Sequence, residues 1–145
     1  FALNVSLGQI LQEGLQARFA RHARISRAVK AGIAALGMGQ VPLSDAIAAH
    51  TMTAPRFPAG VNGADLLPQV SQAGVTLAGG LHAAIKNEYF RIGHMGAVSL
   101  GDALATIGAI ELRWPPAAMF SNRAPGWQPR RRRIWRSHTN RKSLG

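Results

Sequence analysis

The sequence predicts an α+β fold in which a long N-terminal helix and two shorter helices cover a small, mostly antiparallel sheet. Two observations support this prediction. Apolar residues recur every three or four positions over residues 3–36, which is the period of an amphipathic helix. Two later runs, residues 51–58 and 89–94, alternate as strands do, and a helix-start signal follows each of them. Helices layered on a sheet accommodate both periods.

The composition indicates one folded domain, residues 1–114, followed by a basic tail, residues 115–145. Of the 145 residues 47% are hydrophobic, and the net charge is +11. The tail holds eight of the 17 basic residues and none of the six acidic ones, so most of the charge belongs to it. The absence of cysteine excludes disulfides, thiolate metal sites and a cysteine nucleophile. No apolar run reaches the roughly 18 residues of a membrane-spanning helix.

The first 37 residues predict one long connecting helix with a single buried stripe, which ends at Gly37. The stripe consists of Leu3, Leu7, Leu11, Leu15, Phe19, Ile25, Val29, Ile33 and Leu36. His22 interrupts the stripe and is interpreted as a packing or hinge residue. A basic stripe repeats every three residues and is typical of a solvated helix face. It consists of Arg18, Arg21, Arg24 and Arg27.

The centre of the chain predicts two strands around a second helix. Residues 51–58 form a strand at a sheet edge, because Pro55 cannot donate a hydrogen bond to a neighbouring strand. Asn62 is a suitable cap for a helix over residues 63–73. A short strand over residues 75–78 follows.

The last predicted elements are a strand over residues 89–94 and a helix that ends near Trp114. Ser99 and Asp102 have the spacing of a capping box, in which each side chain bonds the other residue's backbone N–H group. The apolar positions predict a buried side for this helix. They are Leu104, Ile107 and Leu112.

The strand over residues 89–94 places an arginine opposite the core. Because side chains alternate along a strand, one face carries Phe90, Ile92 and His94, and the other carries Tyr89, Arg91 and Gly93. A guanidinium group can bind a carboxylate through two parallel hydrogen bonds, which makes Arg91 a candidate anion ligand. From spacing alone, a solvated arginine or a structural ion pair is the more common explanation.

Four segments occur in an order that resembles a known enzyme family. They are "EGLQARFARH", "TMTAPRFPAGVNGADL", "GVTLAGGL" and "YFRIGHMG". Together they resemble the C-terminal small domain of class V, fold-type-I pyridoxal-phosphate aminotransferases, in the alanine–glyoxylate and serine–pyruvate branch. The resemblance covers residues 1–112 and implies ping-pong transamination between small amino acids and 2-oxo acids such as alanine, serine, glyoxylate and pyruvate.

The resemblance also implies roles for particular residues. Arg91 would bind the substrate carboxylate, whereas Gly79 and Gly80 match the family's glycine pair near the active-site mouth and receive no chemical role. The catalytic and cofactor-binding residues lie in the family's large domain. Neither Lys30 nor Lys86 has the sequence context of the lysine that holds pyridoxal 5'-phosphate, and both are expected on the surface. The chain is therefore expected to be an inactive C-terminal fragment of a homodimeric enzyme.

No metal site is expected, because His82 and His94 have no carboxylate at ligand spacing. The tail, residues 115–145, is expected to be disordered or to fold only against a partner. Its arginine block and tryptophans leave nucleic-acid binding open as an alternative function, and a shifted reading frame as a second explanation of its composition. The compartment stays open between the peroxisome and the cytoplasm.

Overall fold

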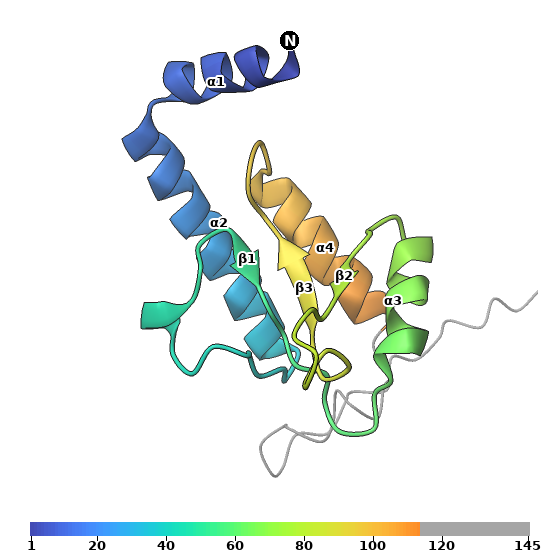
Figure 1. The fold of residues 1–145 in the computed structure, drawn as a ribbon. Coiled ribbons are helices and arrows are strands. Elements are labelled where there is room, and N and C mark those ends of the chain that lie inside the picture. Colours follow the sequence, from blue (N-terminus) through green and yellow to red (C-terminus); the bar gives the residue numbers. More distant parts are fainter. Residues whose placement is uncertain (114–145) are drawn as a thin grey trace, which may run out of the picture.

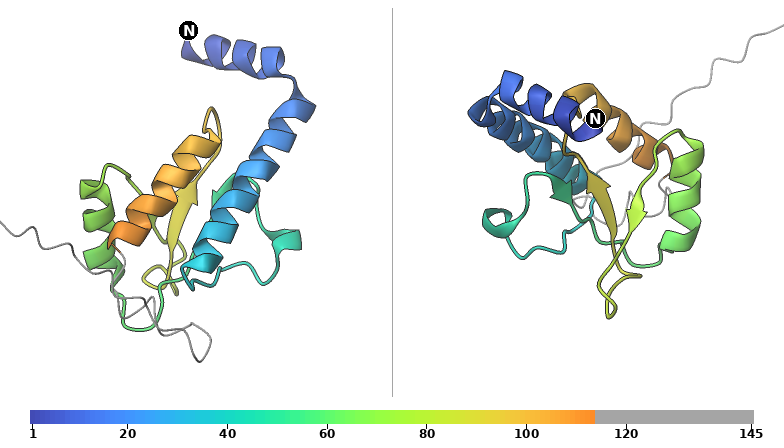
Figure 2. Two further views of the ribbon diagram at one scale, coloured as in Figure 1. Left: turned by 180° about the vertical axis from the view of Figure 1, so that it is seen from behind. Right: turned by 45° about the horizontal axis from the view of Figure 1, so that its top comes forward.

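The computed structural model describes residues 1–113, which form helices on one face of a three-stranded antiparallel sheet. In chain order the elements are α1 (Ala2–Glu13), α2 (Leu15–Ala35), the 3-10 helix η1 (Asp45–Ile47), β1 (Met52–Thr53), α3 (Gly63–Gln72), β2 (Ala78–Gly79), β3 (Phe90–Gly93) and α4 (Leu100–Arg113). β3 is central. α2 and α4 cover one face of the sheet, α3 lies beside α4, and no α-helix of the described part covers the other face (Figures 1 and 2). The predicted α+β fold is confirmed.

The predictions for the tail and for a helix end at Trp114 lie outside the described residues. None of the helices within residues 1–113 combines the length and the apolar composition that crossing a membrane requires.

The first helix is broken, so the prediction of one continuous helix is wrong. Gly14 has a φ of 80° and a ψ of 139°, which no helix accommodates and which glycine adopts without steric cost. α1 consequently turns away from α2 and projects from the body of the domain (Figure 1). The break divides the predicted stripe into two parts with different surroundings.

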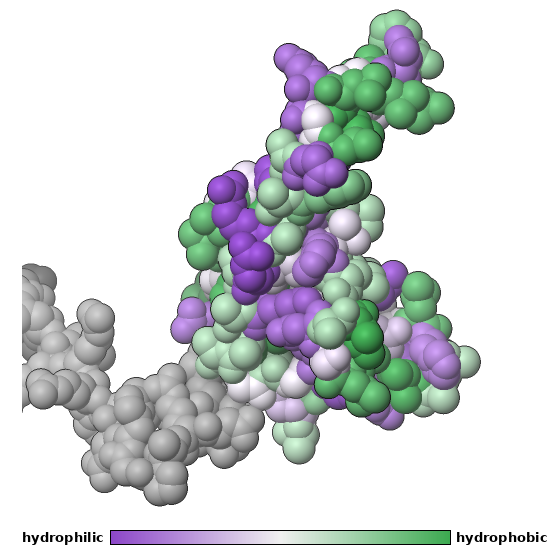
Figure 3. All heavy atoms as spheres, turned by 90° about the vertical axis from the view of Figure 1, so that its left-hand side faces the viewer, coloured by the Kyte–Doolittle hydropathy of each residue, from purple (hydrophilic) through white to green (hydrophobic). Residues whose placement is uncertain are grey.

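Only the second part of the stripe is buried. Ile25, Val29 and Ile33 of α2 face the sheet and are at most 1% exposed. No residue of α1 is buried, and Leu11 is 76% exposed. Figure 3 shows apolar side chains gathered at this projecting end of the molecule. Periodicity predicted which residues share a helix face, but it could not tell whether another element lies against that face.

Two arginines of the basic stripe hold the junction of α1 and α2. Arg21 Nε lies 2.6 Å from one carboxylate oxygen of Glu13, and Arg18 Nη1 lies 2.9 Å from the other. Arg21 also donates to the carbonyl oxygens of Gly96 and Val98, which ties α2 to the loop after β3. The hydrogen bond from Arg21 is the main reason why the pKa of Glu13 falls to about 2. The interpretation of the stripe as a simple solvated face is therefore wrong for these two residues.

The central elements are shorter than predicted. β1 comprises two residues at the sheet edge, and Pro55, beyond its end, forms an isolated bridge to Gln40 and accepts a hydrogen bond from the Phe90 N–H group at 3.0 Å. The Asn62 side chain accepts a hydrogen bond from the Ala64 N–H group at 3.0 Å, so the predicted cap of α3 is confirmed. β2 begins at Ala78, at the end of the predicted strand.

The capping box of α4 is confirmed, because the Asp102 carboxylate accepts from the Ser99 N–H group and the Ser99 hydroxyl accepts from the Asp102 N–H group. The predicted buried side is wrong in part. Leu104 and Leu112 are exposed, whereas the residues that pack inward are Ala103, Ile107, Ala109 and Ile110. The close approach of α2 selects this side: a Cβ atom on Gly32 would lie 2.8 Å from the Ile107 side chain.

Phe90 is the centre of the core. Its side chain is fully buried, and its ring lies 5.2 Å from that of Phe57. Ile92 and His94 point to the same side of β3 and are at most 3% exposed. The alternation predicted for this strand is therefore confirmed for its core face.

Candidate functional site

Arg91 lies on the central strand and points to the face of the sheet that no α-helix covers. Its Nε donates to the Gly79 carbonyl oxygen on the neighbouring strand at 2.8 Å. No other hydrogen bond or ion pair of Arg91 occurs among residues 1–113, and the side chain is partly exposed. A structural ion pair within this part of the chain is thereby excluded. Within the described residues, both terminal amino groups of the guanidinium are therefore available for a ligand.

Arg91 bonds the first residue of the segment over residues 79–82, and Tyr89 bonds the last two residues of that segment. The Tyr89 hydroxyl accepts hydrogen bonds from the backbone N–H groups of Leu81 and His82 at 2.9 and 3.2 Å. These two bonds lower the pKa of the Tyr89 phenol below its usual value of 10.0, and the positive charge of Arg91 adds to the effect. Sequence reasoning placed Tyr89 on the Arg91 face but missed this contact, although Tyr89 is the only tyrosine in the chain.

Gly80 is required by close packing. A Cβ atom at this position would collide with the Lys86 carbonyl oxygen and would lie 2.7 Å from the Tyr89 ring. The glycine therefore allows the turn over residues 81–88 to fold back onto the strand. This contact gives Gly80 a structural role, in line with the absence of any chemical role assigned to the glycine pair from the sequence.

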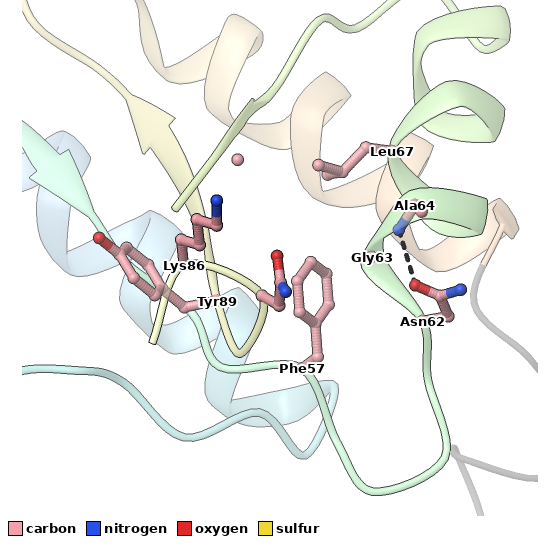
Figure 4. Close-up of a pocket in the computed structure, with 9 residues that line it drawn as sticks. Phe57, Asn62, Gly63, Ala64, Leu67, Lys86 and Tyr89 are labelled. Atoms are coloured by element: carbon pink, nitrogen blue, oxygen red, sulfur yellow. Dashed lines mark hydrogen bonds between the residues drawn. The ribbon is translucent and has the colours of Figure 1, made fainter. Parts of the chain in front are cut away.

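A cavity of about 370 Å³ lies beside this segment. Lys86 and Tyr89 lie on one side of it, and the cap residue Asn62 lies on the other with Ala64 and Leu67 of α3 (Figure 4). Gly79, whose carbonyl oxygen bonds Arg91, also lines it, whereas Arg91 itself does not. The described residues thus form a mainly apolar cavity, with a few polar side chains, next to the backbone that Arg91 bonds.

The two lysines differ from one another. Lys86 is exposed, as expected. Lys30 is 8% exposed, and its Nζ atom lies 3.4 Å from the Asp45 carboxylate, so the expectation that it is a surface residue is wrong. Lys30 lies four residues after the buried Ser26 and therefore on the same side of α2. Its ion pair with Asp45 required the fold.

Two histidines are buried: His22 on α2, and His94 directly after β3. His94 is 1% exposed, and its Nε2 lies 2.9 Å from the Thr53 hydroxyl oxygen. His22 is 7% exposed, which supports the packing role expected for it. Burial lowers the pKa of His94 below its usual value of 6.5, and the charges of His22 and Lys30 lower it further, although backbone carbonyl groups partly oppose them. No group of three or more potential metal ligands occurs among residues 1–113.

The lowered pKa of His94 predicts a loss of stability in acid. Below pH 6.5 the unfolded chain takes up a proton at His94 that the folded chain does not, so the free energy of unfolding falls as the pH drops toward the folded pKa. His94→Gln is expected to flatten this dependence in urea unfolding between about pH 5 and 8. His82→Gln, which changes an exposed histidine, serves as the control. An equal slope in the wild-type chain and in His94→Gln would contradict the prediction.

No family model matches this chain, but individual proteins do. It is 33% identical over 113 residues to an uncharacterized aminotransferase of Methanocaldococcus jannaschii, covering 77% of this chain and 29% of that protein. It is 41% identical over 96 residues to pyridoxamine–pyruvate transaminase of Mesorhizobium japonicum, covering 65% of this chain and 24% of that protein. It is 28% identical over 113 residues to serine–glyoxylate aminotransferase of Arabidopsis thaliana, covering 77% of this chain and 28% of that protein.

The fold agrees with these similarities. The crystal structure of pyridoxamine–pyruvate aminotransferase from Mesorhizobium loti matches with a TM-score of 0.73 and 35% identity, over 80% of this chain and 30% of that chain. The relatives and structural neighbours are class V aminotransferases, so the resemblance of the four sequence segments is confirmed. The chain spans less than a third of the length of these proteins.

Proposed function

We propose that this chain, which is similar over about four fifths of its length to class V aminotransferases, forms the part of such an enzyme that binds the substrate carboxylate. The observation that carries the proposal is the state of Arg91. Its Nε is fixed on the Gly79 carbonyl oxygen, while no group within residues 1–113 occupies its terminal amino groups. A carboxylate can accept two parallel hydrogen bonds from those groups.

The proposed substrates are small amino acids and 2-oxo acids, since both carry the carboxylate that Arg91 would bind. Relatives are named for serine, glyoxylate, pyridoxamine and pyruvate, which supports this class of substrate. Alanine is a further candidate from the resemblance in sequence. Because the resemblance implies a homodimeric enzyme, we propose that the complete enzyme is a homodimer.

The family's cofactor, pyridoxal 5'-phosphate, supplies the electron sink for amino-group transfer when it is bound. The described residues do not fit the task of holding it. Lys30 is a buried residue of α2 that forms an ion pair with Asp45, and Lys86 is an exposed residue of the turn before β3. We therefore propose that residues outside this chain hold the cofactor and that the chain alone does not transaminate.

Titration of the isotope-labelled full chain with pyruvate, at constant ionic strength, tests the carboxylate role. We expect pyruvate to shift the NMR signals of the Arg91 Nε–H group and of the Gly79 and Gly80 amides. Pyruvamide, which carries a neutral amide in place of the carboxylate, is the matched control. Shifts of the same size with pyruvamide, or unchanged shifts of the glycine amides in Arg91→Gln, would contradict the proposal.

The alternative function, nucleic-acid binding, depends on the arginine-rich tail over residues 115–145. These residues lie outside the described part, and no observation within residues 1–113 favours this function over carboxylate binding.

A further inference from the structure

We propose that Tyr89 is a positioning residue for Arg91: its hydroxyl group holds the backbone of residues 79–82 in the conformation from which the Gly79 carbonyl group orients the guanidinium. The inference deepens the proposed function and rests on it, because it concerns how the carboxylate ligand is fixed.

The two side chains hold opposite ends of one short segment. Tyr89 directly precedes β3 and Arg91 is the second residue of the strand, so the two flank Phe90 and leave the chain on the same side, since Phe90 points into the core. Arg91 bonds the Gly79 carbonyl oxygen at the start of the segment. Tyr89 bonds the N–H groups of residues 81 and 82 at its end. The ring of Tyr89 also lies against Gly80, where a Cβ atom would be 2.7 Å away.

The segment needs such a restraint because it contains two consecutive glycines. Glycine has more accessible backbone conformations than any other residue, so a free Gly79–Gly80 pair would let the carbonyl group rotate. β2 ends at Gly79, and the ladder to β3 pairs it with Phe90 but does not extend to Gly80. Beyond that point, the amides of residues 81 and 82 bond only the Tyr89 hydroxyl among residues 1–113. The other backbone bond of the segment, from the Ile85 N–H group to the His82 carbonyl oxygen, stays within the turn and does not tie it to β3.

A fixed carbonyl group matters for binding because it determines the plane of the guanidinium. Two parallel bonds to a carboxylate require that plane to be set before the ligand arrives, or binding loses the free energy of ordering it. Tyr89 would therefore act on affinity through Arg91, without touching the ligand. Its lowered pKa agrees with a hydroxyl oxygen that accepts two hydrogen bonds next to a positive charge.

Tyr89→Phe tests the proposal in the full chain, because it removes the hydroxyl and keeps the ring against Gly80. Leu81 and His82 are exposed, so water can solvate the freed amides and the fold should persist. We expect the Arg91 Nε–H group and the two amides to lose about 10-fold of their protection from hydrogen exchange, and the Kd for pyruvate to rise about 2- to 10-fold. His82→Ala, which keeps the backbone N–H group, should change neither quantity.

Two results would overturn the proposal: Nε–H exchange at Arg91 that is unchanged in Tyr89→Phe, or an unchanged Kd in that variant while the wild-type chain binds pyruvate. If Tyr89→Phe does not fold, the wild-type chain decides. In the wild-type chain, equal protection of the Arg91 Nε–H group and the Leu81 amide from hydrogen exchange would indicate that the two hydrogen bonds open together, which supports the proposal. Clearly unequal protection would refute the proposal. If pyruvate does not shift the NMR signals of the wild-type chain, the proposed function is wrong. The hydrogen-exchange rates of the Arg91 Nε–H group would still show whether Tyr89 orients Arg91.

Discussion

Arg91→Gln is expected to lower kcat/KM for pyruvate roughly 30- to 150-fold in a chimera in which residues 1–113 replace the matching segment of pyridoxamine–pyruvate transaminase. The estimate corresponds to about 2–3 kcal/mol for losing a charge-assisted pair of hydrogen bonds to a carboxylate. Glutamine keeps part of the side chain's length and its ability to donate hydrogen bonds, but it lacks the charge and the planar fork. Steady-state kinetics with each substrate varied in turn measures the effect.

Pyridoxamine provides an internal control, because it has no carboxylate. Its KM should change little in Arg91→Gln, whereas a similar loss for both substrates would contradict the assigned role. Arg56→Gln is the matched arginine control. Arg56 Nη1 already lies 2.7 Å from the Glu88 carboxylate at an exposed position, so its replacement should change kcat/KM for pyruvate less than about twofold. If the chimera is inactive, the pyruvate titration of the full chain decides the question.

Phe90→Ala is expected to lower the free energy of unfolding by about 3–5 kcal/mol, the usual cost of truncating a fully buried phenylalanine. The cavity would open between the Phe57 ring, 5.2 Å away, and the helices that cover the sheet. Because single domains are stable by only about 5–15 kcal/mol, the variant would lose a large share of its stability. Urea unfolding followed by far-ultraviolet circular dichroism measures the change.

Leu104→Ala is the comparison for Phe90→Ala. Leu104 is 64% exposed on α4, so its truncation should change the free energy of unfolding by no more than about 0.5 kcal/mol. A cost at Leu104 similar to that at Phe90 would show that the outer side of α4 is covered in solution. A cost below about 1 kcal/mol at Phe90 would contradict the core described for this domain.

Local signals predicted most of the elements. Asn62 caps α3, and the Ser99–Asp102 capping box starts α4, because a cap requires only side chains and amides within a few residues of one another. The alternation around Phe90 likewise predicted a core face that the structure confirms. The role of Arg91 as a carboxylate ligand stays a prediction, supported by terminal amino groups that no residue between positions 1 and 113 occupies.

The sequence by itself determined the α+β class, the order of the elements after the first helix, the core face around Phe90 and the resemblance to aminotransferases. Only the tertiary structure decided which faces are covered: the stripe on α1 is exposed, Lys30 is buried beside Asp45, and Ile110 rather than Leu104 packs inward on α4. The contact between Tyr89 and residues 81–82 was likewise decided only by the tertiary structure. Periodicity and capping are properties of neighbouring residues, whereas burial depends on which distant segment lies against a face, and one element's pattern does not encode that.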